Sequence, residues 1–248
     1  MTAEQTQPSE VEDFDGLKLR YDSIDDRACA LLGYQRTKQI SRKSRISWEA
    51  GDSQPLFSEV KDRKEDIIQG AFLEIYQEYL PLKTALGPRK IETVCDVGCG
   101  QGINNLFLHR DFEPRFTLVD IEETDSQHHL WAEEGSGYAS LQSAKSLLVE
   151  NGCSEEMIET VNPRKASWKP PAKGFDLVTS LYSCGFHYPI DDYVDLFVTT
   201  IENGGAVCLD LRQRYLRRGS PALSKLLDSG KAIEVFEAVK SSRMLIQG

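Results

Sequence analysis

The sequence VCDVGCGQG at residues 94–102 constrains the fold of this chain more than any other feature. An apolar run enters a turn with glycines at the alternate positions 98, 100 and 102, and Asp96 lies at its start. Glycine adopts positive φ and, without a Cβ, lets another molecule approach the peptide groups. The segment after the turn has a helical pattern, so its free N–H groups would point into the turn. We therefore predict a site for a small anionic or zwitterionic ligand against bare backbone.

A second apolar run, residues 116–120, ends in Asp120, about 20 residues past the turn. In a doubly wound sheet, an acid at this spacing lies on the next strand and binds ribose hydroxyls. The dinucleotide fingerprint G-x-G-x-x-G is broken, because Ile103 stands where the third glycine is needed. The pattern acid-x-G-x-G-x-G instead resembles the first motif of class I S-adenosylmethionine-dependent methyltransferases. A tight turn that binds no ligand is the alternative interpretation.

The resemblance implies a cofactor site. In that family the glycine turn holds the methionine end of S-adenosylmethionine, the acid matching Asp96 fixes the turn and the amino group, and the acid matching Asp120 binds the ribose diol. The family commonly has an acid after the third strand for adenine, whereas residues 161–168 have none, so Asn162 or Ser167 is expected to substitute. The implied cofactor residues are Asp96, Gly98, Cys99, Gly100, Gly102, Asp120, Ile121, Asn162 and Leu181.

Strand and helix patterns alternate after residue 64. An amphipathic helix is predicted at 64–80, ended by Pro81. Strands are predicted near 91–97, 115–120, 157–161, 175–182, 204–211, 231–239 and 242–248. This order predicts an α/β fold with a doubly wound, mostly parallel seven-stranded sheet, the Rossmann-like methyltransferase fold. The resemblance further implies that the last strand inserts antiparallel beside the one before it.

The chain divides into three parts. Residues 1–15 are polar and are predicted to be a flexible tail, 16–63 an N-terminal extension or cap, and 64–248 the methyltransferase domain. Within the extension, a helix is predicted at 23–34, capped by Ser23 and ended by Gly33. Residues 36–45 carry five basic residues and no acid. This run is either a solvated face or a clamp for a phosphorylated or carboxylated substrate.

The composition and net charge of the chain limit the kinds of partner it is expected to bind. The formal net charge of −10 argues against broad binding to nucleic acid or acidic membranes. The six cysteines form no C-x-x-C pair, so we predict reduced, buried thiols. No stretch approaches the roughly 20 apolar residues that cross a bilayer, and the start lacks the apolar core of a secretion signal. These features predict a cytoplasmic protein without a membrane partner, and they leave a homo-oligomer open.

The predicted chemistry depends on the loop at 183–192, which follows the fourth strand and faces the ligand edge of a doubly wound sheet. His187 is the candidate base for a hydroxyl proton, and the two acids Asp191 and Asp192 could orient it. Tyr182, Tyr188 and Asp192 are lesser candidates for shaping the acceptor pocket. The alternative interpretation of His187 is a hydrogen-bonded loop residue packed between its two aromatic neighbours.

The acceptor is predicted from the same loop. The N/D-P-P-Y motif of amino-directed methyltransferases is replaced by SLYSC, which favours an oxygen acceptor. The sequence GFHYPIDDY resembles loops of bacterial sugar and polysaccharide methyltransferases. We therefore predict methylation of a hydroxyl on a small polar acceptor, a sugar or glycan. The alternatives are an RNA methyltransferase that uses residues 36–45, and a catalytically silent partner subunit.

The long insert at 122–137 contains His128 and His129 among several acids. Such a cluster could ligate a divalent ion, but adjacent histidines on a polar loop are more often surface residues, and no ligand spacing here is diagnostic. We therefore predict no metal site.

Overall fold

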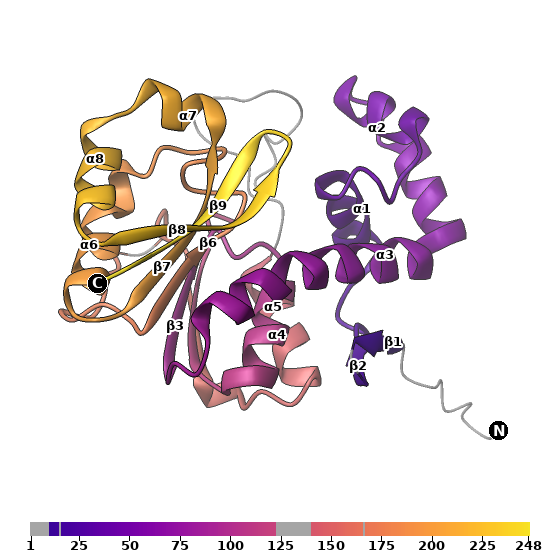
Figure 1. The fold of residues 1–248 in the computed structure, drawn as a ribbon. Coiled ribbons are helices and arrows are strands. Elements are labelled where there is room, and N and C mark those ends of the chain that lie inside the picture. The colour runs from indigo at the N-terminus through magenta and orange to yellow at the C-terminus, as the bar shows by residue number, and fades with distance from the viewer. Residues whose placement is uncertain (1–9, 15, 123–139, 166) are drawn as a thin grey trace.

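A seven-stranded sheet forms the centre of the computed structural model, which describes residues 10–14, 16–122, 140–165 and 167–248 (Figure 1). Its strands are β3 (Thr93–Val97), β4 (Arg115–Val119), β5 (Ile158–Val161), β6 (Leu177–Ser180), β7 (Ala206–Arg212), β8 (Lys231–Ala238) and β9 (Ser241–Gln247). Their order in the sheet is β5-β4-β3-β6-β7-β9-β8. The first five strands in this order pair in parallel, whereas β9 pairs antiparallel with both β7 and β8. The predicted mostly parallel sheet with an antiparallel last strand is confirmed.

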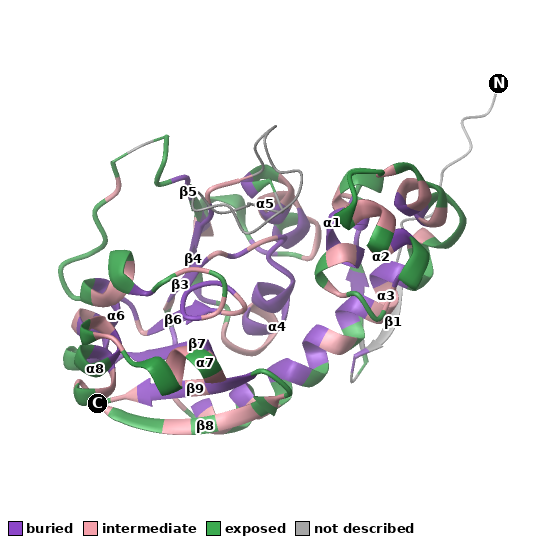
Figure 2. Cartoon of the chain, turned by 90° about the horizontal axis from the view of Figure 1, so that it is seen from above, coloured by how far each residue is buried: buried purple, intermediate pink, exposed green. Residues whose placement is uncertain are grey.

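Helices cover both faces of the sheet, as its doubly wound topology requires. One face packs against α3 (Gln54–Leu86), α4 (Ile103–Phe112) and α5 (Leu141–Glu150), and the other against α6 (Val194–Glu202) and α8 (Pro221–Asp228) (Figure 1). Successive residues of a strand point to opposite faces of the sheet. Val94 packs in the core with α3, α4 and α5, and Cys95 packs in the core with α6 and α8. A short helix, α7 (Gln213–Arg218), follows β7. Figure 2 shows the buried central strands and the edge strand β8, whose residues are exposed or intermediate and none buried.

The extension contains more regular structure than its sequence pattern predicts. A hairpin of β1 (Glu10–Phe14) and β2 (Leu17–Arg20) precedes α1 (Asp26–Gln35) and α2 (Arg42–Glu49). The strand β1 lies within the expected flexible tail, and α2 lies partly within the basic run, which has no hydrophobic periodicity. The predicted domain boundaries stay a prediction.

Helix α1 differs at both ends from the prediction. Asp25, not Ser23, caps it, because the Asp25 carboxylate accepts the Ala28 N–H at 2.7 Å while the Ser23 hydroxyl donates to Glu150. Gly33 does not end the helix but lies buried inside it. A Cβ at Gly33 would lie 2.6 Å from Ile40 Cγ2 and 3.3 Å from Ile67 Cγ2. The glycine therefore allows α1 to pack closely on α3.

Helix α3 continues past Pro81, so the prediction that this proline ends it is wrong. A proline inside a helix removes one backbone hydrogen bond. Leu82 and Leu86 beyond it are 0% and 3% exposed, and their burial in the core keeps the last turns helical. The predicted start at residue 64 coincides instead with a kink, since Arg63 has the non-helical angles φ −138° and ψ 24°.

All six cysteines are buried and form no disulfide, as predicted. Within the described residues, no helix combines the length and the apolar character that a bilayer crossing requires.

We expect Gly33→Ala to lower the free energy of unfolding by about 1–3 kcal/mol, because the added methyl group overpacks the contact with Ile40 and Ile67. Denaturant-induced unfolding followed by circular dichroism measures this change. Gly70→Ala is the matched control inside a helix, since its Cβ would meet only the flexible end of Gln39. Equal stability of the Gly33 variant and the native chain would show that α1 and α3 do not pack closely there.

Candidate functional site

A cavity of about 1110 Å³ opens at the carboxyl ends of the parallel strands. Its walls come from the glycine turn after β3, the end of β4, the loop after β6, and helices α1 and α3 of the N-terminal half. This volume slightly exceeds the range of roughly 300–1,000 Å³ found for ligand pockets, so the cavity has room for two small ligands.

Most of the predicted site residues line this cavity: Asp96, Gly98, Cys99, Gly100, Asp120, Ile121, Leu181, His187 and Asp192. The predicted lesser candidates Tyr182 and Tyr188 line it as well. Gly102 and Asn162 are not among the residues that line it. Gly102 closes the turn instead, in the left-handed conformation that precedes α4.

The glycine turn exposes its backbone as the sequence predicts. Gly98, Gly100 and Gly102 have φ of +74°, +56° and +73°, which side chains with a Cβ rarely adopt. The Gly98 N–H donates to Val119 O at 2.7 Å and so ties the turn to β4. A Cβ at Gly98 would collide with Ser183, whereas one at Gly100 would meet nothing within 4 Å. Gly100 therefore leaves its side of the turn open to a ligand.

Asp96 fixes the turn from beneath. Its carboxylate accepts hydrogen bonds from Thr179 Oγ1 on β6 and from Asn105 Nδ2 on α4, both at 2.7 Å. Burial raises the pKa of Asp96 to about 6, although these two hydrogen bonds oppose the rise. The side chain thus joins β3, β6 and α4 at the floor of the cavity.

Asp120 joins the glycine turn to the end of β4. Its carboxylate accepts the N–H of Gly100 and the N–H of Glu122, each at 3.0 Å. Burial raises the pKa of Asp120 to about 6, against the effect of both hydrogen bonds. A carboxylate held in this way retains lone pairs that can accept hydroxyl donors from a ligand.

Asn104, in the first turn of α4, is a site residue that the sequence analysis missed. It lines the cavity and is 9% exposed, and neither its Nδ2 nor its Oδ1 has a hydrogen-bond partner among the described residues. A buried amide without partners costs about 1–3 kcal/mol, so the arrangement favours a ligand that both accepts and donates there. The amide two residues past the last glycine was the available signal.

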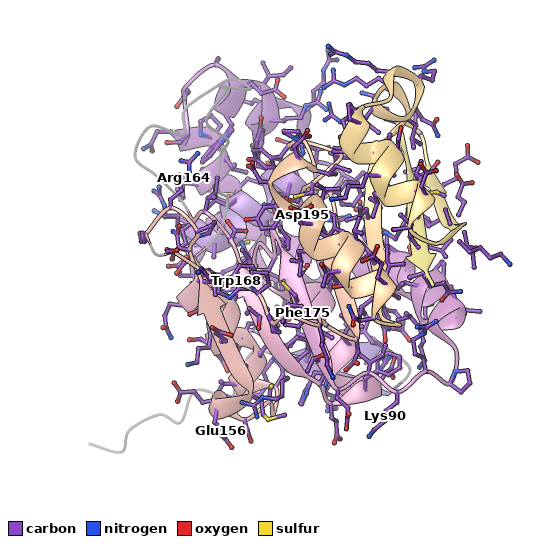
Figure 3. The ribbon with its side chains drawn as sticks, turned by 90° about the vertical axis from the view of Figure 1, so that its left-hand side faces the viewer. Lys90, Glu156, Arg164, Trp168, Phe175 and Asp195 are labelled. Carbon is purple, nitrogen blue, oxygen red and sulfur yellow. The ribbon has the colours of Figure 1, made fainter. Side chains whose placement is uncertain are left out.

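Asn162 does not line the cavity but binds the loops around it. Its Nδ2 donates to Ile121 O at 3.0 Å and to Glu122 Oε2 at 2.8 Å, and its Oδ1 accepts the Arg164 N–H at 3.0 Å. These bonds hold the segments after β4 and β5 together. The later residues Ser167 and Trp168 line the cavity instead. Figure 3 labels Trp168 in the segment that follows β5. Ser167 was the predicted alternative to Asn162, and Trp168 was missed.

His187 lies on the cavity wall among aromatic rings. Its ring centroid is 4.8 Å from that of Phe186 and 6.4 Å from that of Tyr188. Burial, followed by the charges of Arg212 and Arg214, lowers the pKa of His187 to about 4. The imidazole is therefore neutral at pH 7 and able to accept a proton. The charges that shift its pKa come from arginines, not from the acids predicted to orient it.

A buried ion network forms the wall opposite the glycine turn. Arg243 on β9 is 1% exposed, and its Nε and Nη2 donate to the two oxygens of Asp210 at 2.8 Å. The same guanidinium donates to Glu78 O at 2.9 Å and to Glu78 Oε2 at 3.2 Å. From α1, Arg36 Nη1 donates to Glu78 Oε1 at 2.6 Å. These bonds attach α1 and α3 to the sheet.

Tyr182 is held by this network. Its N–H donates to Asp210 at 3.1 Å, its hydroxyl donates to Glu78 at 3.1 Å, and the Arg36 guanidinium lies 5.1 Å from its ring centroid. It keeps the unusual φ of +52° despite its side chain. Burial and the nearby acids raise the pKa of Tyr182, so its hydroxyl stays protonated. Tyr182 therefore shapes the cavity and does not act as a base.

No group of three or more histidine, cysteine, aspartate or glutamate side chains gathers as a metal site within the part of the chain that the structure describes. His128 and His129 lie outside the described residues.

Comparison with known proteins finds no matching protein-family model and no matching curated protein. Among solved structures, ribosomal protein L11 methylase from Lactobacillus delbrueckii subsp. bulgaricus is similar at 18% identity and a TM-score of 0.46, over 69% of this chain and 77% of that one. Geranyl diphosphate C-methyltransferase from Streptomyces coelicolor A3(2) is similar at 14% identity and a TM-score of 0.47, over 74% of this chain and 82% of that one. A methyltransferase from Pyrococcus furiosus is similar at 17% identity and a TM-score of 0.45, over 69% of this chain and 81% of that one. Likenesses of this size assign neither a family nor an activity.

We expect Arg243→Met to lower the free energy of unfolding by about 3–5 kcal/mol, because it leaves the buried carboxylates of Glu78 and Asp210 without their cation. Chemical denaturation measures the loss. Tyr182→Phe removes one hydrogen bond of the same network and should cost about 1 kcal/mol.

The matched control is Lys225→Met. Lys225 pairs with Asp195, but both side chains are more than half exposed, so its loss should cost less than about 1 kcal/mol. If the Arg243 and Lys225 variants unfold at the same denaturant concentration, the buried network does not stabilise the fold.

Proposed function

We propose that this chain is an S-adenosylmethionine-dependent methyltransferase that moves a methyl group to a hydroxyl of a small polar acceptor, a sugar or a glycan. The observation that carries the proposal is the open backbone of Gly100, together with two polar groups of the same cavity. The Asp120 carboxylate retains lone pairs beyond its two hydrogen bonds, and the Asn104 amide has no partner among the described residues. These groups line one cavity with the aromatic loop after β6. The cavity thus has a polar half suited to the cofactor and an aromatic half suited to the acceptor.

The residues present fit the cofactor. Asp120 would accept the ribose hydroxyls, and Asn104 would donate to the carboxylate and accept from the amino group of the methionine end. Trp168 lines the cavity after β5 and offers an apolar face for the adenine. The buried carboxylates of Asp96 and Asp120 favour a cation nearby. When bound, the cofactor supplies a methyl group on a positively charged sulfur.

The acceptor half favours a hydroxyl. Methyl transfer gains mainly from alignment of the acceptor and exclusion of water. Phe186 and Tyr188 present rings for the apolar face of a sugar, and a neutral ring nitrogen of His187 would take the hydroxyl proton. Because its pKa is depressed, His187 is available as the free base throughout the neutral range.

The basic run at 36–45 supports a small acceptor rather than RNA. Arg36 points into the cavity and binds Glu78, while Lys38 is 81% exposed and Arg45 pairs weakly with Glu49 at 3.9 Å. The run thus does not form one continuous phosphate-binding face. With the net charge of −10, this argues against a broad RNA footprint.

The direct test is calorimetry with S-adenosylmethionine and S-adenosylhomocysteine, followed by a transfer assay with labelled methyl donor and a panel of sugars. Binding of either compound and labelling of a sugar support the proposal. Labelling of RNA or protein but no sugar would rule out the sugar acceptor.

We expect Asp120→Ala to raise the dissociation constant of S-adenosylhomocysteine about tenfold or more, because a contact to the ribose worth about 1.4 kcal/mol is lost. Isothermal titration calorimetry measures the constant. His187→Ala is the comparison variant: it should leave this constant nearly unchanged and slow turnover about 10²–10⁴-fold. An unchanged dissociation constant in the Asp120 variant would show that Asp120 does not bind the ribose.

Cofactor binding should weaken in acid. Asp96 and Asp120 have pKa values of about 6 in the free protein, and a sulfonium cation binds best to their ionised forms. Lowering the pH from 7 to 5 protonates both groups, so we expect the dissociation constant of S-adenosylmethionine to rise about tenfold or more. Calorimetry at both pH values measures this rise.

S-adenosylhomocysteine is the matched control ligand, since it lacks the positive charge on sulfur and should depend less on pH. An identical pH dependence for the two ligands would contradict an electrostatic role of these carboxylates.

A further inference from the structure

Arg36, which follows the last residue of α1, offers an unused pair of hydrogen-bond donors to the cavity. Its side chain lines the cavity and is 14% exposed. Its Nη1 donates to Glu78 at 2.6 Å and to Glu74 at 3.4 Å. Its Nε and Nη2 donate no hydrogen bond within the part of the chain that the structure describes, and neither atom is buried. These two N–H groups are parallel, and Arg243 uses the same pair to hold Asp210.

Glu74 on α3 places a hydrogen-bond acceptor beside these donors. Its carboxylate lines the cavity, contacts Arg36 and accepts Gln39 Nε2 at 3.1 Å. A carboxylate has about four acceptor sites, so Glu74 can accept further hydrogen bonds. Each hydroxyl of a sugar both accepts and donates. A pair of donors with an acceptor beside it therefore suits two neighbouring hydroxyls.

The charge of the cavity argues against an anionic ligand at this place. Six acids, but only three arginines and no lysine, line the cavity among the described residues. The charge of Arg36 is already matched by Glu78 and Glu74, and Lys38 approaches Glu74 only to 3.8 Å with its side chain 81% exposed. A phosphate or carboxylate here would be repelled by the excess of negative charge. The wall thus favours an uncharged polar ligand.

Arg36 lies on the same side of the cavity as the candidate base. Its guanidinium carbon is 5.1 Å from the ring centroid of Tyr182, which is 5.0 Å from that of Phe186, and Phe186 is in turn 4.8 Å from His187. All four side chains line the cavity. A ligand held by Arg36 therefore lies along the aromatic surface that leads to His187.

We propose that Arg36 and Glu74 form the subsite that binds the methyl acceptor through two neighbouring hydroxyls, and that this acceptor is an uncharged sugar or glycan. The inference rests on the proposed function and specifies its acceptor. Arg36 would donate from Nε and Nη2 to two hydroxyl oxygens, and Glu74 would accept a hydrogen bond from one of these hydroxyls. Another hydroxyl of the same molecule would face His187. The N-terminal extension thus selects the acceptor.

The first test compares neutral sugars with their uronic acids. Initial rates are measured with saturating labelled S-adenosylmethionine for glucose and glucuronate, galactose and galacturonate, and mannose and mannuronate, pairs that differ only at C6. We expect at least one neutral sugar to be methylated with a kcat/KM about tenfold or more above that of its uronic acid. Equal or faster methylation of the uronic acids would overturn the uncharged acceptor.

The variant Arg36→Lys tests the pair of donors. Lysine keeps a positive charge beside Glu78 but cannot present two parallel donors. We expect it to raise the KM of the effective sugar about tenfold while kcat changes less than about threefold and the dissociation constant of S-adenosylhomocysteine stays the same. Arg63→Lys is the matched control, because Arg63 pairs with Glu59 at 2.7 Å and does not line the cavity. The same KM in both variants would overturn the subsite.

The variant Glu74→Gln tests the selection against anions. It keeps an oxygen that accepts hydrogen bonds and removes the negative charge. We expect the kcat/KM of the uronic acid to rise about tenfold relative to that of the neutral sugar. A purely structural role of Glu74 would change both values by the same factor, and that result would contradict the proposal.

Calorimetry with S-adenosylhomocysteine separates the subsite from the proposed function. Normal cofactor binding without labelling of any sugar, or with labelling that does not depend on Arg36, removes the subsite alone. Absent cofactor binding removes the proposed function. Labelling of an RNA oligomer in place of the sugars, with affinity that falls steeply as salt rises, would overturn the sugar in favour of RNA.

Discussion

The buried guanidinium of Arg243 is the contact on which the cavity depends. It binds Asp210 on the sheet and Glu78 on α3, and Glu78 in turn binds Arg36 on α1. This chain of charges links α1 and α3 to the strands β7 and β9 at the wall of the cavity. Buried ion pairs are costly to assemble, so their value here lies in fixing one arrangement of helices over the site. Tyr182 depends on that arrangement, because its backbone N–H donates to Asp210 and its hydroxyl donates to Glu78.

The opposite wall is built by local chemistry. Alternating glycines force the backbone into left-handed conformations, Asp96 anchors the turn to two neighbouring elements, and Asp120 receives the Gly100 N–H. The three glycines, Asp96 and Asp120 lie within one strand-turn-helix-strand unit, and only the Thr179 hydroxyl that binds Asp96 comes from a distant strand. A ligand at this wall meets groups that are already oriented, so little ordering free energy is lost on binding.

This difference explains how much could be predicted from the sequence. The glycine turn, Asp120 and the strand order follow from short spacing and hydrophobic patterning, which the sequence carries locally. The network of Arg243 and Glu78 joins residues 165 positions apart, and no periodicity marks it. Gly33 and Pro81 were misjudged for a related reason, because tertiary packing against Ile40 and the buried Leu82 overrides the usual helix-ending tendency of these residue types. The hydrogen bonds of Asn162 to the neighbouring loops were likewise not predicted, because such bonds leave no sequence signature.

The lining of the cavity differs in kind from one part to another. Buried carboxylates lie at the glycine turn, where Asp96 and Asp120 accept hydrogen bonds, whereas the loop after β6 contributes the rings of Phe186 and Tyr188. A single cavity that holds two ligands on such different surfaces would align them with each other, and alignment is the main gain that the proposed transfer requires. His187 lies in the aromatic part, and its burial there is the first cause of its depressed pKa.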